Sequence, residues 1–239
     1  MSIVNYATRE ITCKIVYYGP GRSGKTTNLH YIHEQVPDER KGRMVSLATQ
    51  NDRTLFFDFL PLDLGSISGF TTRFQLYTVP GQVYYKTTRK LVLQGADGIV
   101  FVADSQARQL AENVESMQDM HANLAEHGVD ARTMPLVLQY NKQGLPRDLI
   151  VSEAELDDAL NFRGVPAFPA DALHGRGVFE SLRGISNFSN APGYSYQQWL
   201  EIPYVNYELT AEKQPIAQTV LIQAPGQKFD PTKIVRPAK

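Results

Sequence analysis

Residues 19–26 match the pattern G-x-x-x-x-G-K-[ST], which constrains the fold of this chain more than any other feature. In such a loop, backbone N–H groups curl around a polyphosphate, Lys25 reaches the outer phosphate oxygens, and the hydroxyl of Thr26 ligates Mg²⁺. Residues 11–18 predict a strand that enters the loop, and residues 27–33 predict a helix whose N-terminus attracts anions. We therefore expect an α/β fold that binds nucleotide phosphates. The expected phosphate contacts are Gly19, Pro20, Gly21, Arg22, Ser23, Gly24, Lys25, Thr26 and Thr27.

Strand-like and helix-like segments alternate along the rest of the domain, as a parallel, doubly wound sheet requires. Residues 98–103 and 136–140 are continuous apolar runs, which are typical of strands covered on both faces. Residues 55–60 and 72–77 are separated by a glycine-rich turn, which indicates an antiparallel hairpin. The sequence thus predicts a mostly parallel sheet with one antiparallel edge strand.

The composition changes near Ser189. Residues 189–239 contain six prolines, four tyrosines and the single tryptophan, Trp199. This proline density excludes a long helix, yet the aromatic residues and the run at 219–222 are too apolar for a solvating tail. We therefore expect a globular domain of residues 1–188, followed by an extended C-terminal arm that docks on the domain or on a partner.

Charge and end sequences exclude several classes of partner. The net charge of −1 and the pI of about 6.5 disfavour nucleic acid and anionic membrane as partners. The single cysteine, Cys13, cannot form an internal disulfide, and its place in an apolar strand predicts a core position. The first residues show no signal peptide or myristoylation glycine, the last show no prenylation box, and no apolar run reaches membrane-spanning length. We expect a cytoplasmic protein with no nucleic-acid partner and no direct membrane anchor.

A second loop that favours nucleotide chemistry begins at Thr78 and contains Gly81 and Gln82. In GTP-hydrolysing switches, this position carries a glycine that senses the γ-phosphate and a glutamine that orients the attacking water. The pattern usually begins with aspartate, which Thr78 replaces here. Taken alone, these residues would equally fit an ordinary turn, and their placement after the phosphate loop is what favours a catalytic function.

Candidate contacts for the base follow the strand at 136–140. Asn141 and Lys142 match the first half of an N-K-x-D motif, in which the lysine stem packs on the purine and the aspartate accepts two hydrogen bonds from guanine. Gly144 stands in place of that aspartate. Asp171 and Ala172 lie where a backbone contact to the guanine carbonyl is expected. A polar loop after a buried strand is the alternative interpretation.

The segment before residue 55 contains the expected Mg²⁺-contacting switch residue. Thr54 is the best candidate to close over Mg²⁺ and the γ-phosphate. The neighbouring Arg53 could place a guanidinium on the leaving phosphate, a contribution worth ~10³–10⁵ in rate. From these residues alone, a solvated loop charge is the simpler interpretation of Arg53.

Together these motifs resemble the MglA family of bacterial Ras-like small GTPases, which control cell polarity and motility. The resemblance covers residues 1–185 and is dense at residues 14–21, 52–61 and 76–82. Thr78 in place of aspartate is itself a mark of that family.

The resemblance implies a Ras-like G-domain that binds GTP and GDP with Mg²⁺ and hydrolyses GTP slowly. It implies that Arg53 is an intrinsic arginine finger and that Gln82 orients the attacking water. The partners that it implies are a roadblock-fold, MglB-like activating dimer and polarity or motility effectors that bind the GTP form. It also implies concentration of the protein at a cell pole.

Two departures from the family pattern leave an alternative open. Gly144 removes a paired acceptor for guanine, which should cost ~1–3 kcal/mol of discrimination. Gly184 and Pro192 predict that the last helix ends early. The alternative is a catalytically weak nucleotide-binding polarity adaptor with relaxed base specificity.

Gly144→Asp should raise guanine selectivity, unless another residue contacts the base instead. A P-loop kinase would need an acceptor pocket and lid arginines, for which no segment is present.

Truncation after Ser189 tests the arm. Leaving its aromatic surface in water would cost ~25 cal/mol for each Å² that is not buried. We therefore expect the truncated chain to lose thermal stability or partner binding while largely keeping intrinsic GTP hydrolysis, as measured by thermal melting, binding and phosphate release. Equal stability and equal binding in every assay would make the arm dispensable.

Overall fold

The computed structural model describes residues 3–48, 56–67, 69–81, 85–188, 206–209 and 215–218. The chain divides into two units, residues 1–199 and residues 200–239. In the second unit, β9 (Asn206–Leu209) pairs antiparallel with β10 (Pro215–Gln218). Trp199 and the run at 219–222, which the docking prediction concerns, lie outside the described residues. None of the helices within the described segments is long and apolar enough to cross a membrane.

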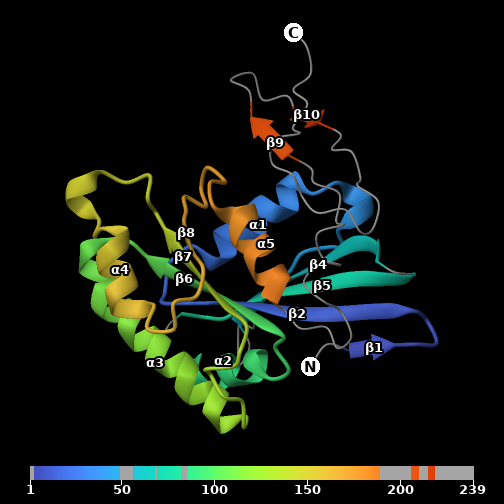
Figure 1. Cartoon of the computed structure of the whole chain (residues 1–239), viewed down its shortest axis with the longest axis horizontal. Coiled ribbons are helices and arrows are strands. Elements are labelled where there is room, and N and C mark those ends of the chain that lie inside the picture. Colours follow the sequence, from blue (N-terminus) through green and yellow to red (C-terminus); the bar gives the residue numbers. More distant parts are fainter. Residues whose placement is uncertain are drawn as a thin grey trace, which may run out of the picture. The chain divides into compact units, whose positions relative to one another are not determined.

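The first unit is built around a mixed β-sheet (Figure 1). The predicted doubly wound arrangement is therefore confirmed. Its strands are β1 (Ile3–Asn5), β2 (Glu10–Tyr18), β3 (Val45–Ala48), β4 (Phe56–Ile67), β5 (Phe70–Thr78), β6 (Gly98–Asp104), β7 (Leu136–Asn141) and β8 (Ala167–Pro169). The order is β3-β4-β5-β2-β6-β7-β8, and β1 pairs antiparallel with β2 outside that path. The pairs β5–β2, β2–β6, β6–β7 and β7–β8 are parallel.

The antiparallel part of the sheet lies at one edge. β4 and β5 form the predicted hairpin, with Phe59 opposite Tyr77 and a register shift between Asp63 and Ser66. The rings of Phe59 and Tyr77 lie 4.8 Å apart, and such cross-strand aromatic pairs stabilise a sheet. β3 pairs antiparallel with the other side of β4, so β4 runs opposite to both of its neighbours and β3 forms the edge itself.

Five α-helices in the described part of the first unit cover the sheet. They are α1 (Lys25–Gln35), α2 (Lys86–Leu93), α3 (Leu110–Glu126), α4 (Glu153–Leu160) and α5 (Val178–Phe188). Short 3₁₀ turns are η1 (Asp38–Arg40), η3 (Ala107–Gln109) and η4 (Arg147–Leu149). α1 and α5 lie on one face of the sheet, and α2, α3 and α4 lie on the other (Figure 1). Because both faces are covered, β6 and β7 are buried along their whole length, and Cys13 on β2 is buried as predicted.

A buried polar network joins the two helices of one face to the middle of the sheet. Gln139 on β7 exchanges two hydrogen bonds with Asn28 on α1, at 2.8 Å and 2.9 Å. Its Nε2 also donates to Ser181 Oγ on α5, at 2.7 Å. All three side chains are fully buried, so each hydrogen bond replaces one that water would otherwise make. The network fixes α1, and with it the loop before α1, against β7.

The prediction that Gly184 shortens the last helix is wrong, because α5 continues through Gly184 to Phe188. The glycine lies against β8, where a Cβ would be 2.7 Å from the ring of Phe168. Gly184 therefore allows the helix to approach the strand closely, and tertiary packing outweighs its low helix propensity.

Gln139→Met tests the buried network. The apolar side chain would leave the amide of Asn28 buried without its partner, so the free energy of unfolding should fall by ~1–3 kcal/mol in urea titrations. The same change at the exposed Gln94 is the control and should stay within about 0.5 kcal/mol of the unmodified protein. Equal effects at the two positions would show that the network does not stabilise the fold.

Candidate nucleotide-binding site

The predicted phosphate loop connects β2 to α1, as the sequence indicates. Gly24 forms the N-cap of α1 with a φ of 103°, a left-handed conformation that favours glycine. A Cβ at Gly24 would also lie 2.1 Å from Nδ2 of Asn141. The first turn of α1 has no side-chain cap and no acidic residue, so its N–H groups remain suited to bind an anion.

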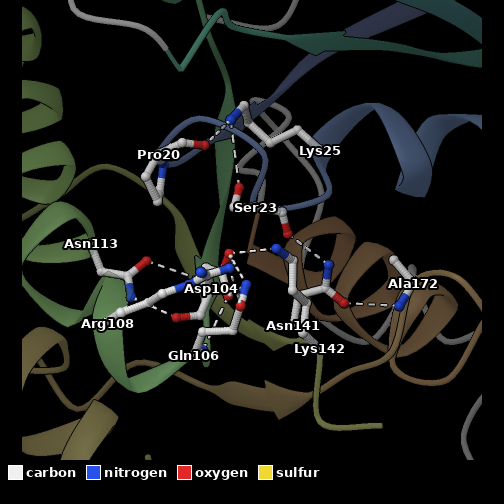
Figure 2. Close-up of polar contacts among 10 residues, drawn as sticks. All are labelled: Pro20, Ser23, Lys25, Asp104, Gln106, Arg108, Asn113, Asn141, Lys142 and Ala172. Atoms are coloured by element: carbon white, nitrogen blue, oxygen red, sulfur yellow. Dashed lines mark hydrogen bonds and ion pairs between the residues drawn. The ribbon is translucent and has the colours of Figure 1, made fainter. Parts of the chain in front are cut away.

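Lys25 is folded back on the loop that it belongs to (Figure 2). Its Nζ donates to the carbonyl oxygens of Gly19, at 2.9 Å, and Pro20, and lies 3.5 Å from Ser23 Oγ. Burial, followed by the positive charge of Arg89, lowers the pKa of Lys25 to about 7, against the opposing effect of Asp58. To contact phosphate, Lys25 must exchange these carbonyl bonds for phosphate oxygens.

A cleft opens in front of this loop. Its volume of about 570 Å³ falls within the ~300–1,000 Å³ typical of small-molecule sites. It is lined by the predicted phosphate contacts Gly21, Arg22, Gly24, Lys25, Thr26 and Thr27, by Gly81 from the loop after β5, and by Asp58, Thr78, Val79, Pro80 and Tyr85. Arg53, Thr54 and Gln82, the other predicted residues of this region, lie outside the described residues.

Asp58 is the residue of this cleft that the sequence analysis missed. Its carboxylate accepts hydrogen bonds from Thr26 Oγ1 at 2.6 Å, Thr78 Oγ1 at 2.9 Å and Ser46 Oγ at 2.7 Å. The side chain is only 6% exposed. Asp58 shares the buried face of β4 with Leu60 at the two-residue spacing of a strand, and a charged residue in that register is the signal that could have identified it.

The donor set around Thr26 suits Mg²⁺. One carboxylate and one hydroxyl, both oxygen donors, lie side by side at the phosphate loop. Mg²⁺ in nucleotide sites is typically held by one or two carboxylates together with phosphates and waters, and does not need a cage of protein ligands. No cluster of three or more histidines, cysteines or acids that could hold a metal ion is found within the described segments.

Asn141 joins the phosphate loop to the two loops predicted to contact a base (Figure 2). Its Nδ2 donates to the carbonyl oxygen of Ser23 at 2.7 Å, and its Oδ1 accepts from the N–H of Ala172 at 2.8 Å. The side chain is buried, so these bonds are shielded from water. Residues that are far apart in the sequence are thus held at one end of the sheet.

Lys142 is positioned by its backbone and by one ion pair. Its φ is 72°, and its Nζ lies 2.5 Å from Oδ2 of Asp104 at the end of β6. Asp104 is 1% exposed and accepts hydrogen bonds from the backbone and side-chain nitrogens of Gln106 (Figure 2). The ion pair holds the end of the Lys142 side chain at β6, and in the neighbouring loops Gly144 and Asp171 lie next to each other.

Comparison with known proteins finds several relatives. The chain is 55% identical over 186 residues to the Mutual gliding-motility protein MglA of Myxococcus xanthus (strain DK1622), covering 78% of this chain and 94% of that protein. It is 26% identical over 151 residues to ADP-ribosylation factor-like protein 6 of Caenorhabditis elegans, covering 62% of this chain and 69% of that protein. The protein of the same name from Caenorhabditis briggsae is 24% identical over 179 residues, which cover 72% of this chain and 84% of that protein. No family model matches the chain.

The lowered pKa of Lys25 predicts that GDP binding takes up a proton. Above about pH 7 the free protein holds Lys25 increasingly neutral, whereas bound phosphate favours the ammonium. GDP affinity should therefore fall by up to about tenfold per pH unit above pH 7, and calorimetry in buffers of different ionisation enthalpy can measure the proton taken up.

Two variants of Lys25 control this measurement. Lys25→Arg keeps its charge at all relevant pH values, so any affinity that it retains should lack the pH slope. Lys25→Ala removes the charge and should lose tight binding. A pH-independent affinity of the unmodified protein would contradict the assigned pKa, and unchanged GDP affinity in Lys25→Ala would remove the phosphate-loop assignment.

Proposed function

The chain belongs to the MglA family of bacterial Ras-like small GTPases, and on this premise we propose that it is a GTP/GDP switch that controls cell polarity or motility. One observation carries the proposal. The phosphate loop, the loop after β5 and the two candidate base loops meet at one end of the sheet, and Asn141 joins three of them. Ligand sites of open α/β sheets lie at this end of the strands.

The binding roles follow the positions of the side chains. Residues 19–27 hold the phosphates, with Lys25 moved from the loop carbonyls to the β- and γ-phosphate oxygens. The stem of Lys142 packs on the purine, while Asn141, Asp171 and Ala172 position the base edge. The N–H of Ala172 donates to Asn141 Oδ1 and the N–H of Asp171 donates to the carbonyl oxygen of Arg176, so a backbone contact to the base requires one of these N–H groups to change partner.

Thr26 and Thr54 are the proposed ligands of Mg²⁺. When bound, the ion would neutralise the negative charge of the phosphates. Asp58 supplies the acidic group that Thr78 does not, because its carboxylate touches both Thr26 and Thr78. We assign Asp58 the part of the aspartate that usually begins the loop after β5.

Hydrolysis is assigned to Arg53 and Gln82. Gln82 orients a water for in-line attack on the γ-phosphorus, the bond from that phosphorus to the bridging oxygen breaks, and GDP and phosphate are released. Arg53 places positive charge on the oxygens that gain negative charge in the transition state. We propose that intrinsic turnover is slow and that a roadblock-fold, MglB-like dimer accelerates it.

The two segments that contain the proposed switch residues, one before β4 and one after β5, adjoin the β4–β5 hairpin in the sequence. Arg53 and Thr54 precede β4 in the chain, and Gln82 follows β5. A change at the γ-phosphate would therefore be transmitted to this edge of the sheet. We propose that polarity or motility effectors bind here in the GTP state, and that the protein acts in the cytoplasm, concentrated at a cell pole.

The second candidate is a catalytically weak polarity adaptor that binds nucleotide with relaxed base specificity. Gly144 is the observation that favours it, because no carboxylate can come from that position. Binding of GDP and ADP with equal affinity, and without turnover of GTP, would support the adaptor.

Arg53→Ala and Gln82→Leu test the enzymatic role. Each residue is assigned to the transition state, so each variant should bind GTP normally and lose hydrolysis, by ~10³–10⁵-fold for the arginine. Release of phosphate from bound GTP measures the rate, with and without the roadblock partner.

Arg43→Ala and Gln94→Leu make the same changes at exposed positions and should keep the original rate. Turnover at the original rate in either Arg53→Ala or Gln82→Leu would show that the role of that residue is wrongly assigned.

A further inference from the structure

The geometry points to Asp171 as the residue that selects guanine in this chain, with its carboxylate in the place that Gly144 leaves open. This inference rests on the proposed function, because it deepens the base contact of the same site. It assigns a side-chain role to Asp171, in addition to the backbone contact considered above.

The two loops that carry these residues are held side by side. β7 and β8 are parallel neighbours, with Tyr140 opposite Pro169. Beyond the strands, the N–H of Gln143 donates to the carbonyl oxygen of Ala170 at 2.9 Å. The N–H of Ala170 in turn donates to the carbonyl oxygen of Tyr140 at 2.8 Å. The positions of residues 144 and 171 are therefore coupled through backbone hydrogen bonds.

The carboxylate of Asp171 occupies the space of the missing side chain. A Cβ on Gly144 would lie 2.1 Å from Oδ2 of Asp171, 3.0 Å from its Cγ and 3.8 Å from its Cβ. The carboxylate is therefore the part of Asp171 that lies nearest to Gly144. With Asp171 in this position, there is no room for a side chain at residue 144. Glycine at 144 and aspartate at 171 fit as a pair.

The carboxylate is held in place but keeps acceptor capacity. The side chain of Asp171 is 15% exposed, and its backbone N–H donates to the carbonyl oxygen of Arg176 at 2.8 Å. Among the described residues, His174 is the only side chain that hydrogen-bonds this carboxylate, at 2.7 Å to Oδ2. His174 is 73% exposed and a carboxylate has about four lone-pair sites, so the group can accept further hydrogen bonds.

Two acceptor oxygens suit one purine edge and not the other. Guanine presents the N1–H and the 2-amino group as adjacent donors, whereas adenine presents an acceptor nitrogen at N1. A carboxylate there should favour guanine by on the order of 10- to 100-fold. The same contact removes the reason for the adaptor alternative, because base selectivity does not then require an acid at residue 144.

This inference reverses the expectation for Gly144→Asp. The added side chain would collide with Asp171 and repel it as a like charge, so selectivity for guanine should not rise. The paired exchange Gly144→Asp with Asp171→Ser relieves the collision and returns the carboxylate to residue 144. We expect the double variant to regain the guanine preference that Asp171→Ser alone loses.

Asp171→Asn tests the inference through a gain in affinity for the xanthine nucleotide XDP. Xanthine keeps the N1–H of guanine but carries a carbonyl in place of the 2-amino group, so an amide with one acceptor and one donor matches it. In titrations of the full chain with GDP, XDP and ADP in the presence of Mg²⁺, Asp171→Asn should move the GDP-to-XDP affinity ratio toward XDP by at least about tenfold. Asp148→Asn, which makes the same change at an exposed position of η4, should leave the ratio unchanged.

The possible results separate this inference from the proposed function. Failure of the unmodified protein to bind GDP or GTP would overturn both. Tight binding of GDP by the unmodified protein, together with an unchanged GDP-to-XDP ratio in Asp171→Asn, would overturn the role of Asp171 alone. Recovery of guanine preference in the double variant would support it even if a single variant proved unstable.

Discussion

The hydrogen bonds of the Asn141 side chain hold the candidate site together. One amide group binds the phosphate loop through Ser23 and the loop after β8 through Ala172, so the phosphate and base positions cannot shift independently. Gly24 leaves the space that this amide needs. One layer deeper, Gln139 binds α1 and α5 in the same way. Both residues lie on β7, which therefore determines the spacing between the phosphate loop and the base loops.

Two acidic side chains lie beside positions where the sequence lacks an expected aspartate. Thr78 replaces the aspartate that usually begins the loop after β5, and Asp58 on the neighbouring strand touches Thr78 and Thr26. Gly144 replaces the aspartate of the base loop, and the carboxylate of Asp171 lies against it. In both cases a carboxylate lies next to the substituted residue, and this proximity is the basis of the roles that we propose for Asp58 and Asp171.

The sequence predicted what local patterns determine. The phosphate loop, the buried strands β6 and β7 and the β4–β5 hairpin follow from motif spacing and hydrophobic pattern, and all are present. The charge of Asp58 within the apolar pattern of β4 is a signal that the sequence contains, but its contacts with Thr26 and Thr78 depend on how the strands pair. The contact between Asp171 and Gly144 depends on the approach of two loops, which no local pattern contains. The helix-ending role predicted for Gly184 is wrong because it rests on the low helix propensity of glycine, a local property. The close approach of Gly184 to Phe168 is a tertiary contact that propensity does not reveal. The switch residues Arg53, Thr54 and Gln82 lie outside the described residues, and their roles stay predictions.

The central claim is that this site is complete for a guanine nucleotide despite Gly144. A crystal structure of the full chain with GDP and Mg²⁺ tests it most directly. We predict that the purine packs on the stem of Lys142, with N1 and the 2-amino nitrogen about 2.7–3.2 Å from the oxygens of Asp171. A base that turns away from Asp171, or that is bound with no acceptor facing N1 and the 2-amino group, would contradict the account.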